Sequence, residues 1–294
     1  VYTALATPMR DGKIDREAWP RLVQRQLEAG VAGLVPLGST GEAATLLADE
    51  KEWLVRSCVE MARGRAAVVA GAGSNSTAAT IDNVRAVKAW GADAALVVTP
   101  YYNKPQQHGL VSHYLALVSR CDLPIVMYNV PGRTAVNLLP ATAAALAAEP
   151  QIVGLKESSG DLGQIEQAIA ACNLKVLSGD DGLNFAVYGL GGRGCVSVVS
   201  NLLPGHVVAV WRAWAAGDVG RAFWLSRALD PVTRACFIET NPVPVKNLLH
   251  LAGLCAPEVR LPLGEVTGAH AADLARFYRD VLAGLLASDR EVAA

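Results

Sequence analysis

Lys156 closes the apolar run Ile-Val-Gly-Leu at residues 152–155, a pattern typical of a buried strand. A buried ammonium loses its proton more easily than one in water, and the free amine is a nucleophile that can form an imine with a carbonyl group. Strand alternation places Ile152 and Gly154 on the same face as the lysine, so we expect Gly154 to leave room for its side chain. The alternative is a lysine that has left the strand and reaches solvent from the loop at residues 157–160.

Three further apolar runs lead into loops that carry hydroxyl groups. The loops read Gly-Ser-Thr-Gly-Glu at 38–42, Thr-Pro-Tyr-Tyr-Asn-Lys-Pro at 99–105 and Tyr-Asn-Val-Pro-Gly-Arg-Thr at 128–134. In the first loop, backbone N–H groups and the hydroxyls of Ser39 and Thr40 suit a carboxylate. An ordinary glycine-rich turn before the next helix is the alternative.

Tyr128 ends the strand before the Lys156 strand, so in a closed barrel the two residues are neighbours across a ladder. A phenol beside an amine can move the protons that imine formation requires. A tyrosine that only fills the core is the alternative. Arg133 follows a Pro-Gly turn, and its planar guanidinium suits a substrate carboxylate.

These residues lie at the ends of predicted strands that alternate with predicted helices along the chain. Apolar, β-branched runs end near residues 7, 39, 71, 99, 128, 156, 178 and 198, and segments of helical periodicity lie between them at residues 16–29, 49–62, 77–90, 108–120, 140–148 and 162–171. Eight strands alternating with helices predict a (β/α)8 TIM barrel, with the chemistry at the carboxyl ends of the strands. An open doubly wound sheet is the alternative, disfavoured because no Gly-x-Gly-x-x-Gly follows the first strand.

The 294 residues exceed the roughly 250 typical of such a barrel, and the excess falls at the end of the chain. We predict that residues 1–217 form the barrel, with a last helix at 201–216. Residues 218–294 are predicted to form a C-terminal helical domain, with helices at 219–235, 243–252 and 268–287.

The amino-acid composition limits the classes of molecule that the protein is expected to bind. With 26 basic and 27 acidic side chains the net charge is −1, which indicates neither a nucleic-acid nor a membrane partner and favours a small substrate. No secretory signal opens the sequence, and the six cysteines lack C-x-x-C spacing, so we expect reduced thiols and a cytoplasmic protein. The five histidines form no metal-ligand pattern, and no metal site is expected.

Together the motifs resemble the dihydrodipicolinate synthase family of the class I aldolase superfamily, which also includes N-acetylneuraminate lyase. The resemblance covers nearly the whole chain, and its segments are residues 6–9, 38–42, 101–105, 128–134, 154–157, 178–181, 241–246 and 260–263. The family condenses pyruvate with L-aspartate 4-semialdehyde to 4-hydroxy-tetrahydrodipicolinate, in lysine and diaminopimelate biosynthesis.

The resemblance assigns roles to single residues. It implies that Lys156 forms the imine with pyruvate, that Thr40 and the turn amides hold the pyruvate carboxylate, and that Arg133 binds the semialdehyde carboxylate. The remaining members are a proton relay of Tyr128, Ser39 and Tyr102, and a lining of the pyruvate side by Gly179 and Val196. Tyr102 would come from the neighbouring subunit of a homotetramer built from two tight dimers, and neither a metal nor an organic cofactor is implied.

Two alternatives to the synthase remain open at this stage. Ser39 occupies the position where synthases usually have threonine. The sequence Gly-Ser-Thr-Gly-Glu is typical of sialic-acid lyases and related sugar-acid aldolases or dehydratases. The segment Val-Pro-Gly-Arg-Thr at residues 130–134 favours the synthase instead. A non-catalytic metabolite-binding barrel is the more distant alternative.

The resemblance also bears on regulation. In synthases inhibited by L-lysine, polar or acidic residues after the glycine–hydroxyl turn and in the third loop hold the inhibitor. Here Ala48 and Ala79 stand in these stretches, and Lys51 adds a positive charge. We therefore expect no inhibition by millimolar L-lysine, unless other side chains compensate.

Overall fold

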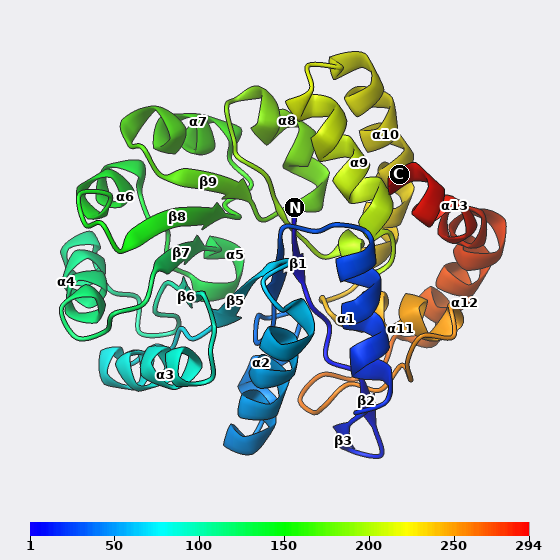
Figure 1. Cartoon of the computed structure of the whole chain (residues 1–294), viewed down its shortest axis with the longest axis horizontal. Helices are drawn as coiled ribbons and strands as arrows, with labels where there is room; N and C mark the ends of the chain where they lie inside the picture. The colour runs from blue at the N-terminus through cyan, green and yellow to red at the C-terminus, as the bar shows by residue number, and fades with distance from the viewer. Residues whose placement is uncertain (294) are drawn as a thin grey trace. The chain divides into compact units, whose positions relative to one another are not determined.

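The computed structural model describes residues 1–293 (Figure 1). Its main sheet has eight strands in the order β10-β1-β4-β5-β6-β7-β8-β9. The strands follow one another in chain order and the last lies beside the first, whereas a doubly wound sheet reverses its strand order partway. The predicted (β/α)8 barrel is therefore confirmed, and the open sheet is excluded.

The eight strands are short and end within four residues of the predicted positions, the largest difference being Val35 against residue 39. Their bounds are β1 Tyr2–Ala4, β4 Gly33–Val35, β5 Ala67–Gly71, β6 Ala94–Val98, β7 Ile125–Asn129, β8 Ile152–Glu157, β9 Lys175–Ser178 and β10 Val196–Ser197.

By its contacts the chain divides into two compact units. The first unit comprises Val1–Ala66 and Ser197–Ala294, and the second comprises Ala67–Val196. The boundary predicted at residue 217 falls between two helices of the first unit, α9 (Pro204–Ala215) and α10 (Val219–Cys236), and stays a prediction.

In the second unit, strands β5 to β9 pair in parallel, and α3, α4, α6 and α7 flank them (Figure 1). The side chains of Ser76 and Asp161 cap the N-termini of α3 and α7 by accepting hydrogen bonds from the N–H groups of Ala79 and Gln164. The helices are α3 Thr77–Ala89, α4 Gln107–Val118, α5 Pro131–Thr134, α6 Pro140–Leu146, α7 Leu162–Ala171 and α8 Asn184–Gly189. Neither α5 nor α8 was predicted, because a helix of four or six residues is too short to show a hydrophobic period.

In the first unit, the predicted C-terminal helical extension is present. The helices are α1 Ala18–Glu28, α2 Ala48–Ala62, α9 Pro204–Ala215, α10 Val219–Cys236, α11 Val243–Leu251, α12 Gly268–Phe277 and α13 Ala283–Ala293, with a π-helical turn at Tyr278–Leu282 between the last two. Within residues 1–293, no helix combines the length and apolar character needed to cross a membrane.

A small hairpin in the first unit was not predicted. Strand β2 (Met9–Arg10) pairs antiparallel with β3 (Lys13–Ile14) through the turn residues Asp11 and Gly12, which have φ angles of 53° and 74°. Asp-Gly is the sequence favoured for such a two-residue turn, so the signal was present in the sequence.

Candidate active site

Lys156 is the penultimate residue of β8, and only 7% of its surface is exposed. It lies directly opposite Tyr128 of β7, as predicted, and its Nζ is 4.0 Å from the centroid of the Tyr128 ring. Within the described residues 1–293, the amine makes no hydrogen bond and no ion pair. It is therefore buried, held over an aromatic face and not engaged by an acid.

The other buried lysine of the described chain is different. Lys246 of α11 is fully buried, and its Nζ donates a hydrogen bond of 2.6 Å to Oε1 of Glu42. Burial lowers the pKa of the Lys246 ammonium, while the Glu42 carboxylate opposes this by favouring the charged form. Because this amine is enclosed and paired, Lys156 is the better candidate for a nucleophile that must reach a substrate.

Gly179 provides the space beside Lys156. A Cβ at this position would lie 2.8 Å from Cε of Lys156 and would collide with Oγ of Ser158. The sequence had suggested Gly154 for this role, but a Cβ there would first meet the Lys175 carbonyl oxygen, at 3.0 Å. That expectation is wrong because the lysine side chain leans toward the end of the neighbouring strand β9.

Gly179 and Val196 occupy matching positions at the end of the second unit's sheet. Ser178 forms an isolated parallel bridge with Cys195, and each of the two residues follows one member of this bridge. Val196 is buried and opens β10. The structure thus brings Lys156, Tyr128 and Gly179 together and places Val196 beside the adjoining bridge.

Arg133 lies on the short helix α5 that directly follows β7. This turn is held by Thr134, whose hydroxyl lies 3.2 and 2.9 Å from the carbonyl oxygens of Val130 and Val136 and accepts from the N–H of Val136. A fixed turn limits the directions that the exposed Arg133 guanidinium can take, which suits recognition of a carboxylate.

Tyr102 does not pack against the Lys156–Tyr128 pair of its own chain. The loop after β6 holds it at φ 73°, and 87% of its surface is exposed. Lys104 also has a positive φ, 48°, and the Asn103 side chain donates to the Asn75 carbonyl oxygen at 2.9 Å. A left-handed backbone conformation is energetically unfavourable for tyrosine, so the loop holds the exposed phenol in a strained conformation.

In the first unit, the turn after β4 carries Ser39 and Thr40. The N–H groups of Gly41 and Glu42 donate to the carbonyl oxygens of Gly38 and Ser39, at 3.0 and 3.1 Å. In the described chain, this leaves the N–H groups of Ser39 and Thr40 without a hydrogen-bond partner. Two adjacent unpaired amides beside two hydroxyls are suited to binding an anion, and the structure thus names the N–H groups that the sequence alone did not specify.

The side chains of this turn are anchored from the C-terminal helical segment. Oγ1 of Thr40, a buried residue, accepts from Nδ2 of Asn241 at 2.9 Å. Both oxygens of Glu42 are bound, one by Lys246 and the other by the N–H of Arg260 at 2.9 Å.

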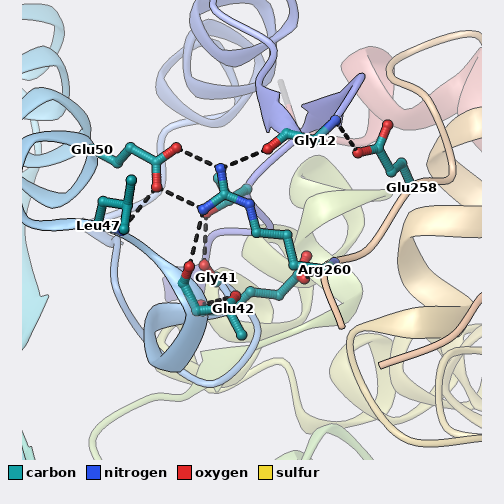
Figure 2. A network of polar contacts seen from close by, with 9 residues as sticks. Gly12, Gly41, Glu42, Leu47, Glu50, Glu258 and Arg260 are labelled. Atoms are coloured by element: carbon teal, nitrogen blue, oxygen red, sulfur yellow. Dashed lines mark hydrogen bonds and ion pairs between the residues drawn. The ribbon is translucent and has the colours of Figure 1, made fainter. Parts of the chain in front are cut away.

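Figure 2 shows the Arg260 guanidinium between the Glu50 carboxylate and the Gly12 carbonyl oxygen. Because of this contact, the pKa of the Glu50 carboxyl lies below its usual value. No role was predicted for Glu42, Lys246 or Arg260 from the sequence. The signal that could have indicated one is their place in the motifs at residues 38–42, 241–246 and 260–263.

An unpaired buried amine beside a phenol can form and hydrolyse imines, with the phenol moving protons. The anion nest and the arginine suit small carboxylic acids. Comparison with known proteins agrees with this chemistry. The model of the dihydrodipicolinate synthetase family matches residues 1–279.

The curated 4-hydroxy-tetrahydrodipicolinate synthase of Maridesulfovibrio salexigens is 45% identical over 276 residues, which cover 93% of this chain and 94% of that protein. The solved dihydrodipicolinate synthase of Thermotoga maritima is 42% identical, with a TM-score of 0.94 over 97% of this chain and 98% of that one. A structure described as a monomeric dihydrodipicolinate synthase variant is equally similar, with 42% identity and a TM-score of 0.94 over 97% of this chain and 96% of the other. The resemblance predicted from the sequence is confirmed: the chain belongs to the dihydrodipicolinate synthetase family.

Proposed function

We propose that the protein condenses pyruvate with L-aspartate 4-semialdehyde to 4-hydroxy-tetrahydrodipicolinate, in the synthesis of lysine and diaminopimelate. The observation that carries this function is the Lys156 amine, buried at the end of β8, without an acidic partner and over the Tyr128 ring. The relative from Maridesulfovibrio salexigens, which carries the name of this synthase and aligns with 93% of the chain, supports the same reaction.

The reaction begins when the Lys156 amine attacks C2 of pyruvate. Tyr128 gives a proton to the carbinolamine hydroxyl, water leaves, and the imine forms. Loss of a methyl proton produces an enamine, whose carbon attacks the semialdehyde carbonyl. The semialdehyde's own amine then displaces Lys156 by transimination, which closes the ring and frees the lysine.

The family resemblance supplies the remaining roles. Thr40, with the turn amides, binds the pyruvate carboxylate, and Arg133 binds the semialdehyde carboxylate. Ser39 and Tyr102 complete the proton relay with Tyr128, while Gly179 and Val196 line the pyruvate side. The unpaired amides of Ser39 and Thr40 support the first of these assignments.

Trapping of the imine tests this function. Pyruvate with sodium borohydride should attach a reduced pyruvyl group to Lys156, located by mass spectrometry of the digested protein. Lys156→Ala should gain no such group, whereas Lys175→Ala, which removes an exposed lysine on β9, should react normally. An unmodified Lys156 in the unmutated protein would exclude an imine mechanism and leave the non-catalytic barrel as the better explanation.

A sugar-acid aldolase would also trap pyruvate, so the aldehyde must be tested separately. We expect turnover of pyruvate with aspartate semialdehyde, and no efficient cleavage of N-acetylneuraminate or 2-keto-3-deoxygluconate. The Val-Pro-Gly-Arg-Thr segment and the name of the curated relative favour this order. Preferred cleavage of either sugar acid would reassign the substrate.

We further propose a cytoplasmic homotetramer in which Tyr102 acts in the site of a neighbouring subunit. The exposed, strained position of Tyr102 supports an intersubunit role. Inactive Tyr102→Phe and Lys156→Ala proteins, mixed under conditions of subunit exchange, should then regain activity, because some dimers contain one complete site. No recovery after confirmed exchange would mean that Tyr102 acts in its own subunit.

A further inference from the structure

A buried carboxylate directly follows the proposed imine-forming lysine and has no place in the reaction described above. Glu157 ends β8 and is 1% exposed. Asn129 ends β7 and is also buried. The strand register pairs Tyr128 with Lys156 and, one step further, Asn129 with Glu157. Because side chains alternate along a strand, the second pair lies on the opposite face of the sheet from the first.

The second pair is joined by side-chain hydrogen bonds. Nδ2 of Asn129 donates to both carboxylate oxygens of Glu157, at 3.1 and 3.0 Å. Oε1 of Glu157 also accepts from the N–H of Ser159 at 2.7 Å. The other end of the Asn129 amide accepts from the N–H of Leu138 at 2.9 Å. The carboxylate thus fixes the chain after β8, and the amide fixes the chain after β7.

The bonds continue to the surrounding helices. Nδ2 of Asn129 also lies 2.8 Å from Oδ1 of Asn137. Asn137 exchanges two hydrogen bonds with Gln164 of α7, at 2.7 and 3.0 Å. The network therefore ties together two strand ends, the loop before α6, and α7.

Burial of this carboxylate carries a desolvation cost, which is a disadvantage if the pair serves only the stability of the fold. Burial raises the pKa of the Glu157 carboxyl, and the hydrogen bonds from Asn129 and Ser159 only oppose that effect. Apolar side chains would hold two strands together at a lower desolvation cost. What they would not do is fix the register and the orientation of the strand ends, which directional hydrogen bonds can.

We propose that Asn129 and Glu157 are positioning residues, which hold the ends of β7 and β8 so that the Lys156 amine stays against Tyr128 during imine formation. The inference rests on the proposed function and deepens it. It assigns the pair no contact with the substrate, so its effect should fall on the chemical step and not on substrate binding.

Exchange of the two side-chain types tests the pair. Glu157→Gln brings a second amide toward the Asn129 amide and weakens the bond without changing the size of the side chain. Asn129→Asp alone sets two carboxylates against each other. The double variant Asn129→Asp/Glu157→Gln reverses the donor and the acceptor, and it restores the hydrogen bond between these two residues and the net charge, but not the bond from residue 129 to Asn137. Glu166→Gln, on the exposed face of α7, is the matched control.

The measurement is the single-turnover rate of borohydride-trapped adduct on Lys156, together with kcat and KM for pyruvate. Misplacement of reacting groups by about 1 Å costs up to about a hundredfold. We expect Glu157→Gln to slow trapping and kcat by about tenfold to a hundredfold, with KM for pyruvate changed less than about threefold. The double variant should recover most of the rate, and Glu166→Gln should match the unmutated protein.

Several outcomes would overturn the inference. One is an unchanged trapping rate in Glu157→Gln, and another is a double variant no faster than the slower single variant. If Glu157→Gln fails to fold, the double variant is the deciding measurement. A double variant that folds but reacts slowly contradicts the positioning role. Failure of both variants to fold also contradicts it, and would mean that the pair serves the general stability of the protein. Absence of any adduct in the unmutated protein would instead overturn the proposed function itself.

Discussion

Tyr128 and Lys156 face each other across strands β7 and β8, with the lysine amine 4.0 Å from the centre of the phenol ring. The amine thus lies over the ring face. A ring face attracts a charged ammonium, and the hydroxyl at the ring edge remains available for proton transfer. The contributions of the Tyr128 ring and of its hydroxyl can therefore be distinguished by mutation.

Tyr128→Phe keeps the ring under the amine and removes only the hydroxyl. We expect a folded protein whose kcat falls by at least about a hundredfold, the usual scale of general acid–base help. Tyr278→Phe, which removes a phenol hydroxyl from the π-helical turn, is the control and should remain active. Steady-state kinetics at saturating pyruvate measures both, and a kcat within a few-fold of the unmutated protein would remove Tyr128 from the relay.

Gly179→Ala should separate reactivity from stability. The added methyl group would displace the end of the Lys156 side chain and the Ser158 hydroxyl, and both can move without disturbing the backbone. We expect the rate of pyruvate trapping to fall at least about tenfold, because the amine is misplaced, with little change in the melting temperature. Gly264→Ala, where a Cβ meets nothing within 4 Å, should change neither. Normal trapping in Gly179→Ala would show that the lysine tolerates a different position.

The sequence predicted the barrel and the Tyr128–Lys156 pair because both depend on local features. Each strand is a continuous apolar run, and consecutive strands of a barrel are neighbours, so the ends of successive runs meet. The same reasoning predicted that Ser39, Thr40 and Arg133, in the loops after the strands, belong to the site, and their roles stay a prediction.

Contacts that depend on side-chain direction or distant segments were not predictable in this way. Glu42 meets Lys246 and Arg260 across more than 200 residues, and no spacing rule joins them. Gly154 was expected to leave the space beside the lysine because strand alternation predicts which face a side chain takes, but not how the side chain leans along the sheet.

Arg133→Ala should affect one substrate more than the other. If the guanidinium binds the semialdehyde carboxylate, its loss raises KM for the semialdehyde by about tenfold or more, the cost of a charged hydrogen bond, and leaves KM for pyruvate nearly unchanged. Arg120→Ala removes an exposed arginine just after α4 and serves as the control. Equal increases in both KM values would contradict the assigned role.

L-Lysine should not inhibit this enzyme at millimolar concentration. The stretches that match the inhibitor-binding residues of lysine-sensitive synthases contain Ala48 and Ala79, and Lys51 adds a like charge. Loss of an acidic partner for an ammonium reduces affinity by about a hundredfold or more. Rates at subsaturating pyruvate, with lysine raised in tenfold steps, measure the effect. Clear partial inhibition below about 1 mM, which corresponds to roughly −4 kcal/mol of binding, would show that other side chains compensate.

Glu50→Gln should destabilise the protein in a pH-dependent manner. The Arg260 guanidinium donates to the Glu50 carboxylate at 2.6 Å, and both side chains are largely buried. This contact lowers the pKa of Glu50 in the folded state, so the ionised carboxyl stabilises the fold above its unfolded pKa of about 4.5, and the contribution is lost as pH falls through the folded pKa. At pH 7 we expect a loss of about 1–3 kcal/mol in the free energy of unfolding.

Urea unfolding of both proteins between pH 7 and pH 3 measures this loss. The difference between the unmutated protein and Glu50→Gln should shrink as the solution becomes more acidic than pH 4.5, because the unmutated carboxyl then takes up its own proton. Glu52→Gln is the matched control: its partner Arg56 is on the same helix, both side chains are about half exposed, and the expected change is below about 1 kcal/mol. A difference for Glu50→Gln that stays constant across this range would mean that shape, and not charge, makes Glu50 important beside Arg260.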